Sequence, residues 1–135
     1  MKIIALDIGD VHTGIAISDA LGILARPLTT VPAPTLTSFL TDLFQQEQIS
    51  TALVGYPKTL RGTISDQTKK VEVTKQELEQ TFPTITWLFW DERLSSKRAD
   101  TLKKNISKEE KLLSHARAAA FILTSYLDYR HFHAN

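Results

Sequence analysis

The stretch LDIGDVHTGIAISD, residues 6–19, constrains the fold more than any other part of the chain. A continuous apolar run with β-branched residues precedes Asp7, and alternating apolar and polar residues follow Gly14. The first pattern predicts a buried strand and the second a returning strand, with Gly9 and Gly14 framing the turn between them. Asp7 then lies at the end of a buried strand, which is costly for a carboxylate unless a charge partner or a metal ion meets it.

Apolar periodicity in the remainder of the chain predicts further strands and helices around this hairpin. We expect strands over 23–31, 50–57 and 84–93, and helices over 35–48, 65–81, about 95–104, and 108–129. Pro27 indicates an edge strand, because proline cannot donate to a sheet ladder.

The order of these elements predicts an α/β fold with a mixed five-stranded sheet flanked by helices. Its second strand runs antiparallel and its helices cover both faces. The right-handed crossover rule adds the fourth and fifth strands in parallel beside the first. Acidic residues that end the first and fifth strands then converge at the edge where open α/β sheets bind ligands.

Length and composition limit the class of protein. The 135 residues have the usual size of one domain, so we predict a single domain over 1–135. The chain has no cysteine, which excludes disulfides and thiolate sites. The N-terminal apolar run is too short for a signal peptide or a membrane span, so we expect a soluble cytoplasmic protein without a membrane partner.

Charge is distributed unevenly along the chain. Residues 1–57 carry a net charge of −3 and residues 58–135 a net charge of +4. A basic C-terminal half suits a polyanionic partner such as a nucleic acid. A solvated lysine-rich surface explains the same distribution equally well.

Acidic residues end both predicted strands that converge. Asp7 ends the first strand, and Asp91 and Glu92 end the fifth. Several carboxylates close together can bind hard divalent cations, which activate water and stabilise a leaving oxygen. In the structural alternative, Asp7 caps a turn amide and Glu92 pairs with a nearby arginine. The periodicity alone slightly favours the structural alternative.

Five segments, in this order and spacing, resemble the YqgF family. They are LDIGDVHTGIAISD, ARPL, LVGYPKTLRGTISDQ, WDERLSS and AAAFILTSYLD. The resemblance implies a ribonuclease-H-like fold akin to RuvC-type resolvases, and a metal-dependent nuclease that uses Mg²⁺ or Mn²⁺. It further implies that Asp7 is the first metal-binding carboxylate and that Glu92, with Asp91 beside it, is the second.

The chain departs from the family pattern in two places. Val11 and His12 stand where the family usually has a basic pair, and His115 stands where it usually has an aspartate. An imidazole can ligate Mn²⁺ more readily than Mg²⁺, or it can orient or protonate a water. We therefore predict His115 as a catalytic and metal-binding residue. A core histidine and a weakened enzyme remain open alternatives.

Basic residues near the expected site are candidate nucleic-acid ligands. Lys58 and Arg61 lie in a loop that resembles the family's strand-to-helix loop, and Arg93, Lys97 and Arg98 follow the fifth strand. An ordinary surface loop is a serious competing interpretation for the first pair.

The resemblance implies hydrolysis of phosphodiester bonds during maturation of the 5′ end of 16S ribosomal RNA. The expected partner is structured RNA, either the precursor or a ribosomal particle. Two alternatives stay open: a Holliday-junction-resolvase-like endonuclease acting on branched DNA, and a catalytically weakened nucleic-acid-binding protein of ribosome assembly. Nothing in the sequence marks a dimer seam, so we expect a monomer or a weak dimer.

Overall fold

A computed structural model describes residues 1–57, 66–91 and 107–133. The predicted helix at about 95–104 lies outside the described residues, as does nearly all of the loop that follows the fourth strand. The described elements are β1 (Lys2–Ile8), β2 (His12–Ser18), β3 (Ala25–Pro32), η1 (Ala33–Thr35), α1 (Leu36–Gln46), β4 (Ile49–Tyr56), α2 (Asp66–Thr81), β5 (Thr86–Asp91) and α4 (Lys108–Phe132). They lie close to the predicted ranges. The last helix continues three residues past its predicted end at 129.

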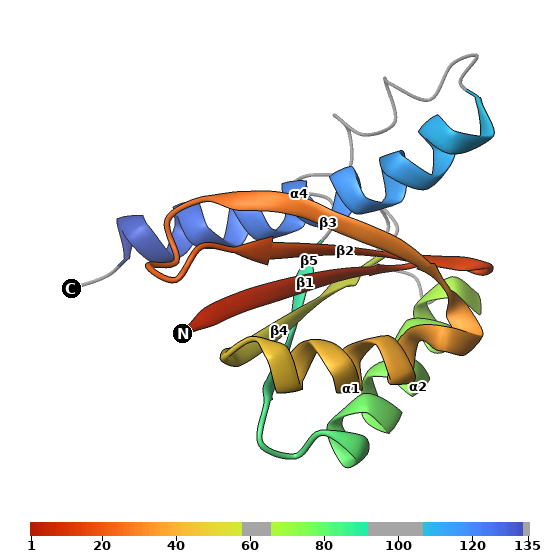
Figure 1. The fold of residues 1–135 in the computed structure, drawn as a ribbon, viewed down its shortest axis with the longest axis horizontal. Helices are drawn as coiled ribbons and strands as arrows, with labels where there is room; N and C mark the ends of the chain where they lie inside the picture. Colours follow the sequence, from red (N-terminus) through yellow and green to blue (C-terminus); the bar gives the residue numbers. More distant parts are fainter. Residues whose placement is uncertain (58–65, 92–106, 134–135) are drawn as a thin grey trace.

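The five strands form one sheet in the order β3-β2-β1-β4-β5 (Figure 1). β2 runs antiparallel to β1 and β3, whereas β4 and β5 run parallel to β1. The predicted mixed sheet and its strand directions are confirmed. Pro27 lies in β3, which is an edge strand as predicted.

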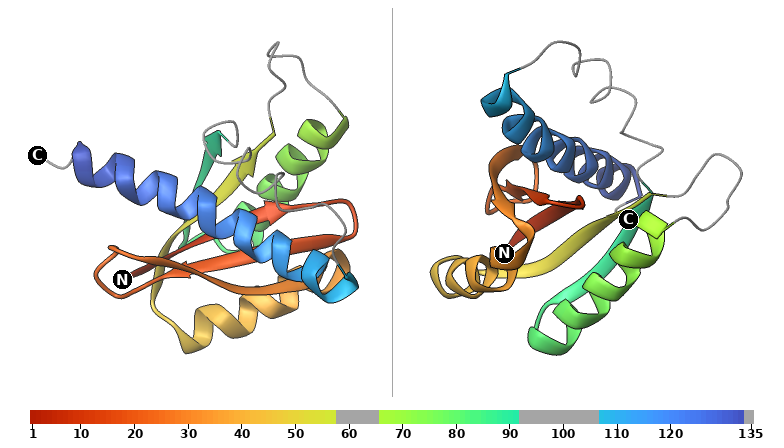
Figure 2. Two further views of the ribbon diagram at one scale, coloured as in Figure 1. Left: turned by 90° about the horizontal axis from the view of Figure 1, so that it is seen from above. Right: turned by 90° about the vertical axis from the view of Figure 1, so that its right-hand side faces the viewer.

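Helices cover both faces of the sheet. Figure 2 shows α4 packed on one face, with α1 and α2 on the other. Side chains along β1 alternate between two hydrophobic cores: Ile4 and Leu6 face α1 and α2, while Ile3 and Ala5 face α4. This alternation is the period-2 pattern of a central strand.

Helix α4 lies very close to β2 at Gly14. A Cβ atom built on Gly14 would lie 2.0 Å from the His115 carbonyl oxygen. Gly14 pairs in register with Asp7 inside the sheet, so the prediction that it frames the turn is wrong. A helix backbone occupies the space of its side chain, which periodicity does not reveal. Gly9 does belong to the turn, where its N–H donates to the His12 carbonyl oxygen at 2.9 Å.

The two tryptophans of β5 lie on opposite faces, as their spacing predicts. Trp87 is buried in the core under α1 and α2, and its Nε1 donates to the Phe82 carbonyl oxygen at 3.2 Å. Trp90 packs against the α4 core, and its Nε1 bonds to Ser125 Oγ at 3.1 Å. Both rings therefore contribute to the packing of the two hydrophobic cores.

Helix α4 begins with a serine cap. Ser107 Oγ accepts from the Glu110 N–H at 3.2 Å, as a capping serine does. No helix in the described part of the chain is both long and apolar enough to cross a membrane.

Candidate functional site

Asp7 lies near the carboxyl end of the central strand, on the face covered by α4. It pairs directly with Gly14. Opposed residues of an antiparallel pair are about 4.5–5.5 Å apart at Cα and share a face of the sheet. Because the missing Gly14 side chain would point at α4, the Asp7 carboxylate projects to that same side. The side chain is half-buried, as the sequence predicts for an acid at the end of a core strand.

His115 lies beside the turn that follows Asp7. Its Cε1 would be 3.7 Å from a Cβ atom on Gly9, and its ring stacks against His12 with centroids 6.0 Å apart. The structure therefore brings Asp7 and His115 to the same end of the same face. Whether they act on one ion stays a prediction.

Close packing of α4 fixes the position of His115. Ala116 and Ala119 are buried against the sheet, and small side chains there let the helix approach β2 closely. Thr30 Oγ1 on β3 donates to the Leu112 carbonyl oxygen and ties the first half of α4 to the edge strand. Contacts of α4 residues before and after His115 in the chain thus fix the position of the histidine.

Two α2 side chains hold the backbone that follows Asp7. Gln67 Nε2 donates to the Ile8 carbonyl oxygen at 2.7 Å, and Lys70 Nζ donates to the Asp10 carbonyl oxygen at 2.8 Å. Neither residue was predicted from the sequence as part of the site, and His12 was named only as a departure from the family pattern. A polar residue in the first turns of a helix does not reveal, from the sequence alone, which backbone carbonyl group its side chain will bind. The one signal for His12 was its position directly after the turn that follows Asp7, at the start of β2.

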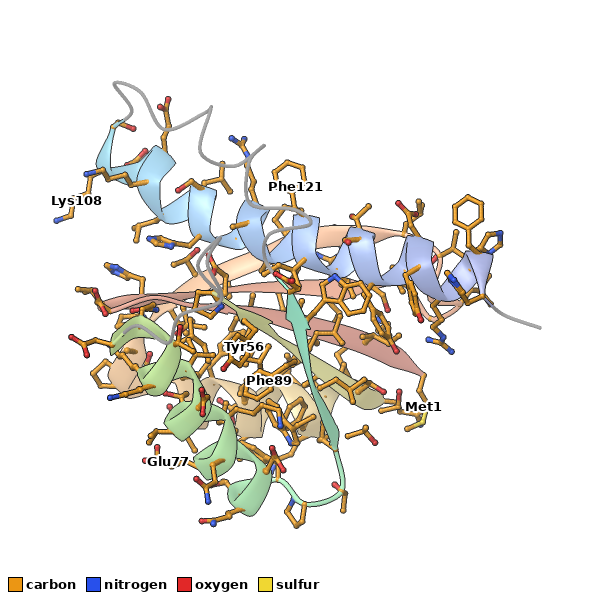
Figure 3. The ribbon with its side chains drawn as sticks, turned by 180° about the vertical axis from the view of Figure 1, so that it is seen from behind. Met1, Tyr56, Glu77, Phe89, Lys108 and Phe121 are labelled. Atoms are coloured by element: carbon orange, nitrogen blue, oxygen red, sulfur yellow. The ribbon has the colours of Figure 1, made fainter. Side chains whose placement is uncertain are left out.

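Asp91 lies at the end of β5, which β4 separates from β1. It pairs in register with Tyr56, and alternation places it on the same side as Phe89. The rings of Tyr56 and Phe89 meet with centroids 4.7 Å apart, and both lie on the α2 side of the sheet (Figure 3). Alternation therefore does not favour Asp91 as a ligand beside Asp7, and its role stays a prediction.

Glu92 lies outside the described residues, as do the predicted nucleic-acid ligands Lys58, Arg61, Arg93, Lys97 and Arg98. Convergence of the carboxylates that end β1 and β5 therefore rests on Glu92 and stays a prediction.

The donors near Asp7 can be compared with what a metal ion needs. Within residues 1–57, 66–91 and 107–133, no group of three or more His, Cys, Asp or Glu side chains is arranged to hold a metal ion. The two predicted donors that do share a face are a carboxylate, Asp7, and an imidazole, His115. This pair fits part of a site for an ion such as Mn²⁺, which accepts both oxygen and nitrogen. Glu92 is the further donor that the sequence predicts for this site.

One titratable group next to this end of the sheet is perturbed. Tyr56 donates its hydroxyl proton to Glu72 Oε1 at 2.7 Å, and this hydrogen bond to a carboxylate raises the pKa of Tyr56 above its usual value. The bond links the end of β4 to α2. It strengthens the attachment of that helix beside the candidate site.

A family model described as "RuvX: Holliday junction resolvase" matches residues 1–129. Among curated proteins, a relative from Rubrobacter xylanophilus is 41% identical over 71% of this chain and 69% of its own length. A relative from Bacteroides fragilis is 35% identical over 94% of this chain and 96% of its own. Both bear the name "Putative pre-16S rRNA nuclease".

Solved structures of RuvC from Thermus thermophilus share the fold. One has a TM-score of 0.56 at 14% identity and covers 98% of this chain and 97% of its own. Another, in complex with a Holliday junction substrate, has a TM-score of 0.59 at 15% identity, covering 97% and 96%. RuvC has a ribonuclease-H-like fold, so the predicted fold class is confirmed.

Proposed function

Because this chain belongs to the RuvX family, we propose that it is a nuclease that hydrolyses phosphodiester bonds in pre-16S ribosomal RNA. The carrying observation is the position of Asp7, which ends the central strand on the face shared with His115. The names of relatives that match nearly the full chain support the RNA substrate. Such an enzyme would act in the cytoplasm, during maturation of the 5′ end of 16S ribosomal RNA.

The proposed enzyme depends on Mg²⁺ or Mn²⁺ held by Asp7 and Glu92, with His115 as a further ligand and Asp91 beside them. When bound, a divalent ion would make water a better nucleophile and neutralise charge on the leaving oxygen. An imidazole among the ligands favours Mn²⁺ over Mg²⁺, because Mg²⁺ prefers oxygen.

The remaining residues position these groups. The β1–β2 ladder fixes Asp7, and Gln67 with Lys70 holds the backbone of the following turn. A rigid backbone keeps the carboxylate at a constant distance from the scissile phosphate. His115 is fixed by the packing of α4 over Gly14.

Lys58, Arg61, Arg93, Lys97 and Arg98 are the proposed phosphate contacts. They belong to the half of the chain that carries the positive charge. Contacts of this kind position the substrate without reading its sequence. We propose structured RNA as the partner, with the protein acting as a monomer or weak dimer.

The second candidate function is resolution of four-way DNA junctions. It is favoured by the description of the family model and by the fold shared with a RuvC that is bound to a Holliday junction. A resolvase would form a stable symmetric dimer and cut paired strands. A third candidate, a ribosome-assembly protein without catalysis, rests on His115 in place of the family aspartate.

One experiment separates these functions. Purified protein is incubated with a pre-16S ribosomal RNA and with a four-way DNA junction, each with Mg²⁺ or Mn²⁺. Asp7→Asn removes the charge with little change in shape, and Asp10→Asn, at an exposed acid in the adjacent turn, is the matched control.

We expect metal-dependent cleavage of the RNA that Asp7→Asn abolishes and Asp10→Asn retains. Cleavage of the junction alone would favour the resolvase. Binding of RNA without cleavage under any metal would favour the assembly protein.

A further inference from the structure

A cavity of about 140 Å³ lies beneath the turn that follows Asp7, on the side of the sheet covered by α1 and α2. Its wall includes the end of β1, the start of β2 and side chains from both helices. Aliphatic groups come from Ile8, Leu36 and Leu78, and polar groups from Thr13, Lys70 and Glu77. Glu77 projects from α2, and Figure 3 shows this helix packed beside the same end of the sheet. Nothing in the proposed cleavage reaction uses this cavity.

Thr13 is the unusual residue of the cavity. Its side chain is only 1% exposed, yet Oγ1 has no hydrogen-bond partner among the described residues. A buried hydroxyl without a partner destabilises a fold, so a polar group from outside the chain is expected to meet it. Alternation along β2 turns Thr13 away from α4 and toward the cavity that it lines.

The size of the cavity argues against a single bridging water. One ordered water needs roughly 10–15 Å³ of such space, which is about a tenth of the volume present. The chemistry of the wall argues against a phosphate. Glu77 offsets the charge of Lys70, whose ammonium already donates to the Asp10 carbonyl oxygen, and the three aliphatic side chains would gain nothing from an anion. A ligand with apolar faces and an edge of mixed donors and acceptors fits better.

A nucleobase has this combination. Its faces can pack on Ile8 and Leu78, and its edge can bond to the Thr13 hydroxyl, the Lys70 ammonium and the Glu77 carboxylate. Proteins that recognise RNA sequence commonly bind unstacked bases and form hydrogen bonds to their edges.

We propose that this cavity binds one unstacked nucleobase of the RNA strand next to the bond that is cut. The inference rests on the proposed nuclease function and names how that site selects its substrate. Ile8 and Gly9 line the cavity and directly follow Asp7, so the Cα atoms of Asp7 and Gly9 are at most about 7 Å apart. A strand whose phosphate meets Asp7 can therefore pass over the end of the sheet and place a neighbouring base on its other face.

Nucleotide binding tests the cavity directly. Adenosine and uridine 5′-monophosphate and, separately, inorganic phosphate are titrated into the full chain, and amide chemical shifts are recorded. Thr37→Phe fills the cavity from an exposed helix position, and Thr13→Val removes the hydroxyl at nearly constant shape. Thr86→Val, at an exposed threonine on β5, is the matched control.

We expect at least one nucleotide to shift the amides of Gly9 and Thr13, with inorganic phosphate giving no such shift. Binding should weaken at least tenfold in Thr37→Phe and Thr13→Val and stay unchanged in Thr86→Val. If no nucleotide binds, or if Thr13→Val only raises the melting temperature, the cavity holds water alone and the inference is overturned. Equal shifts from inorganic phosphate would overturn the nucleobase in favour of an anion.

Cleavage patterns test whether the base belongs to the substrate. RNAs that differ at single positions around the cut are digested by the wild type and by Thr37→Phe. We expect the wild type to prefer some bases at one position, and Thr37→Phe to lose that preference while still cutting. A wild type that cuts all bases equally overturns the substrate role. Nucleotide binding in a wild type that cuts no RNA refutes the nuclease function and assigns the cavity to free nucleotides.

Discussion

The β1–β2–β3 meander has two turns at opposite ends of the sheet, and they are stabilised in different ways (Figure 1). The turn after Asp7 receives hydrogen bonds from Gln67 and Lys70 on α2, and His115 of α4 lies against it. All of these contacts come from residues more than fifty positions away in the chain.

The second turn, residues 19–24, closes on itself. Asp19 Oδ1 accepts from the Ile23 N–H at 2.7 Å and the Leu24 N–H at 3.3 Å. Gly22 has a φ of 69°, a left-handed conformation that glycine adopts without strain. Large apolar side chains are exposed here, with Leu21 80% accessible. The comparison indicates that the turn beside Asp7 is positioned by the tertiary fold, whereas the other is a local structure.

Gly14→Ala should have the largest effect on stability. The new Cβ would meet the His115 backbone, which a rotamer change cannot relieve, so α4 must move off the sheet. We expect a loss of at least about 3 kcal/mol, at the upper end for overpacked cores. Urea unfolding measures it. Wild-type stability in this variant would show that α4 does not contact β2 at Gly14.

His115→Ala should mainly affect activity. If His115 is a ligand, the nuclease rate should fall by roughly 10- to 100-fold while the fold is retained, because alanine suits a helix. His115→Asp should keep activity and shift the preference towards Mg²⁺, since carboxylate oxygen is the harder donor. Rates with both metals and melting temperatures are compared. Full activity with a lowered melting temperature in the alanine variant would rule out the ligand role.

Gly22→Ala should weaken only the second turn. A residue with a side chain pays about 1–2 kcal/mol for the left-handed conformation. The nearest atom to the new Cβ is Arg130 Nη1 at 3.9 Å, which is an ordinary contact. The expected loss of stability therefore comes from the backbone conformation alone. We expect lower stability in urea and an unchanged nuclease rate. A changed rate would mean that the two turns are coupled.

Gln67→Ala should separate positioning from stability at the first turn. Loss of the hydrogen bond to the Ile8 carbonyl oxygen should cost about 1 kcal/mol. The nuclease rate should fall by more than this loss of stability explains, because the backbone after Asp7 is freed. Gln76→Ala, at an exposed position of the same helix, is the control. Equal rates in the two variants would contradict the positioning role.

Lowering the pH should have the smallest effect of these changes, and it should act on the stability of the second turn. Hydrogen bonds from backbone N–H groups, chiefly that of Ile23, lower the pKa of Asp19 below its usual 3.8. A lowered native pKa means that ionised Asp19 stabilises the fold above its unfolded pKa, and that this contribution is lost as the pH falls through the native value. The melting temperature of wild type should exceed that of Asp19→Ala at pH 7, and the difference should shrink below about pH 4. A difference independent of pH would contradict this origin.

Local signals in the sequence predicted most of the fold. Continuous apolar runs marked the central strands, helical spacing marked α1, and Pro27 marked the edge strand β3. Each signal depends on a few neighbouring residues and on which face of the strand or helix is buried. The hairpin connections and the handedness of crossovers then left few possible strand orders.

The candidate site was predicted only in part. Asp7 was recognisable because a carboxylate ended an apolar strand, and the family resemblance pointed to His115. The resemblance could not show that Gly14 lies under α4, that His12 stacks on His115, or that Asp91 alternates to the α2 side. These facts depend on register and helix placement, and a shift of one residue would reverse them.

The sequence by itself determined which segments form strands and helices, which face of each is buried, and that an acid ends the central strand. The tertiary structure alone decided what surrounds that acid. Gln67 and Lys70 reach the turn after Asp7, and Thr13 lines a cavity, only because α1, α2 and α4 pack at particular places on the sheet. Strand and helix propensities are local energies, whereas these contacts join residues distant in the chain and depend on how whole elements fit together.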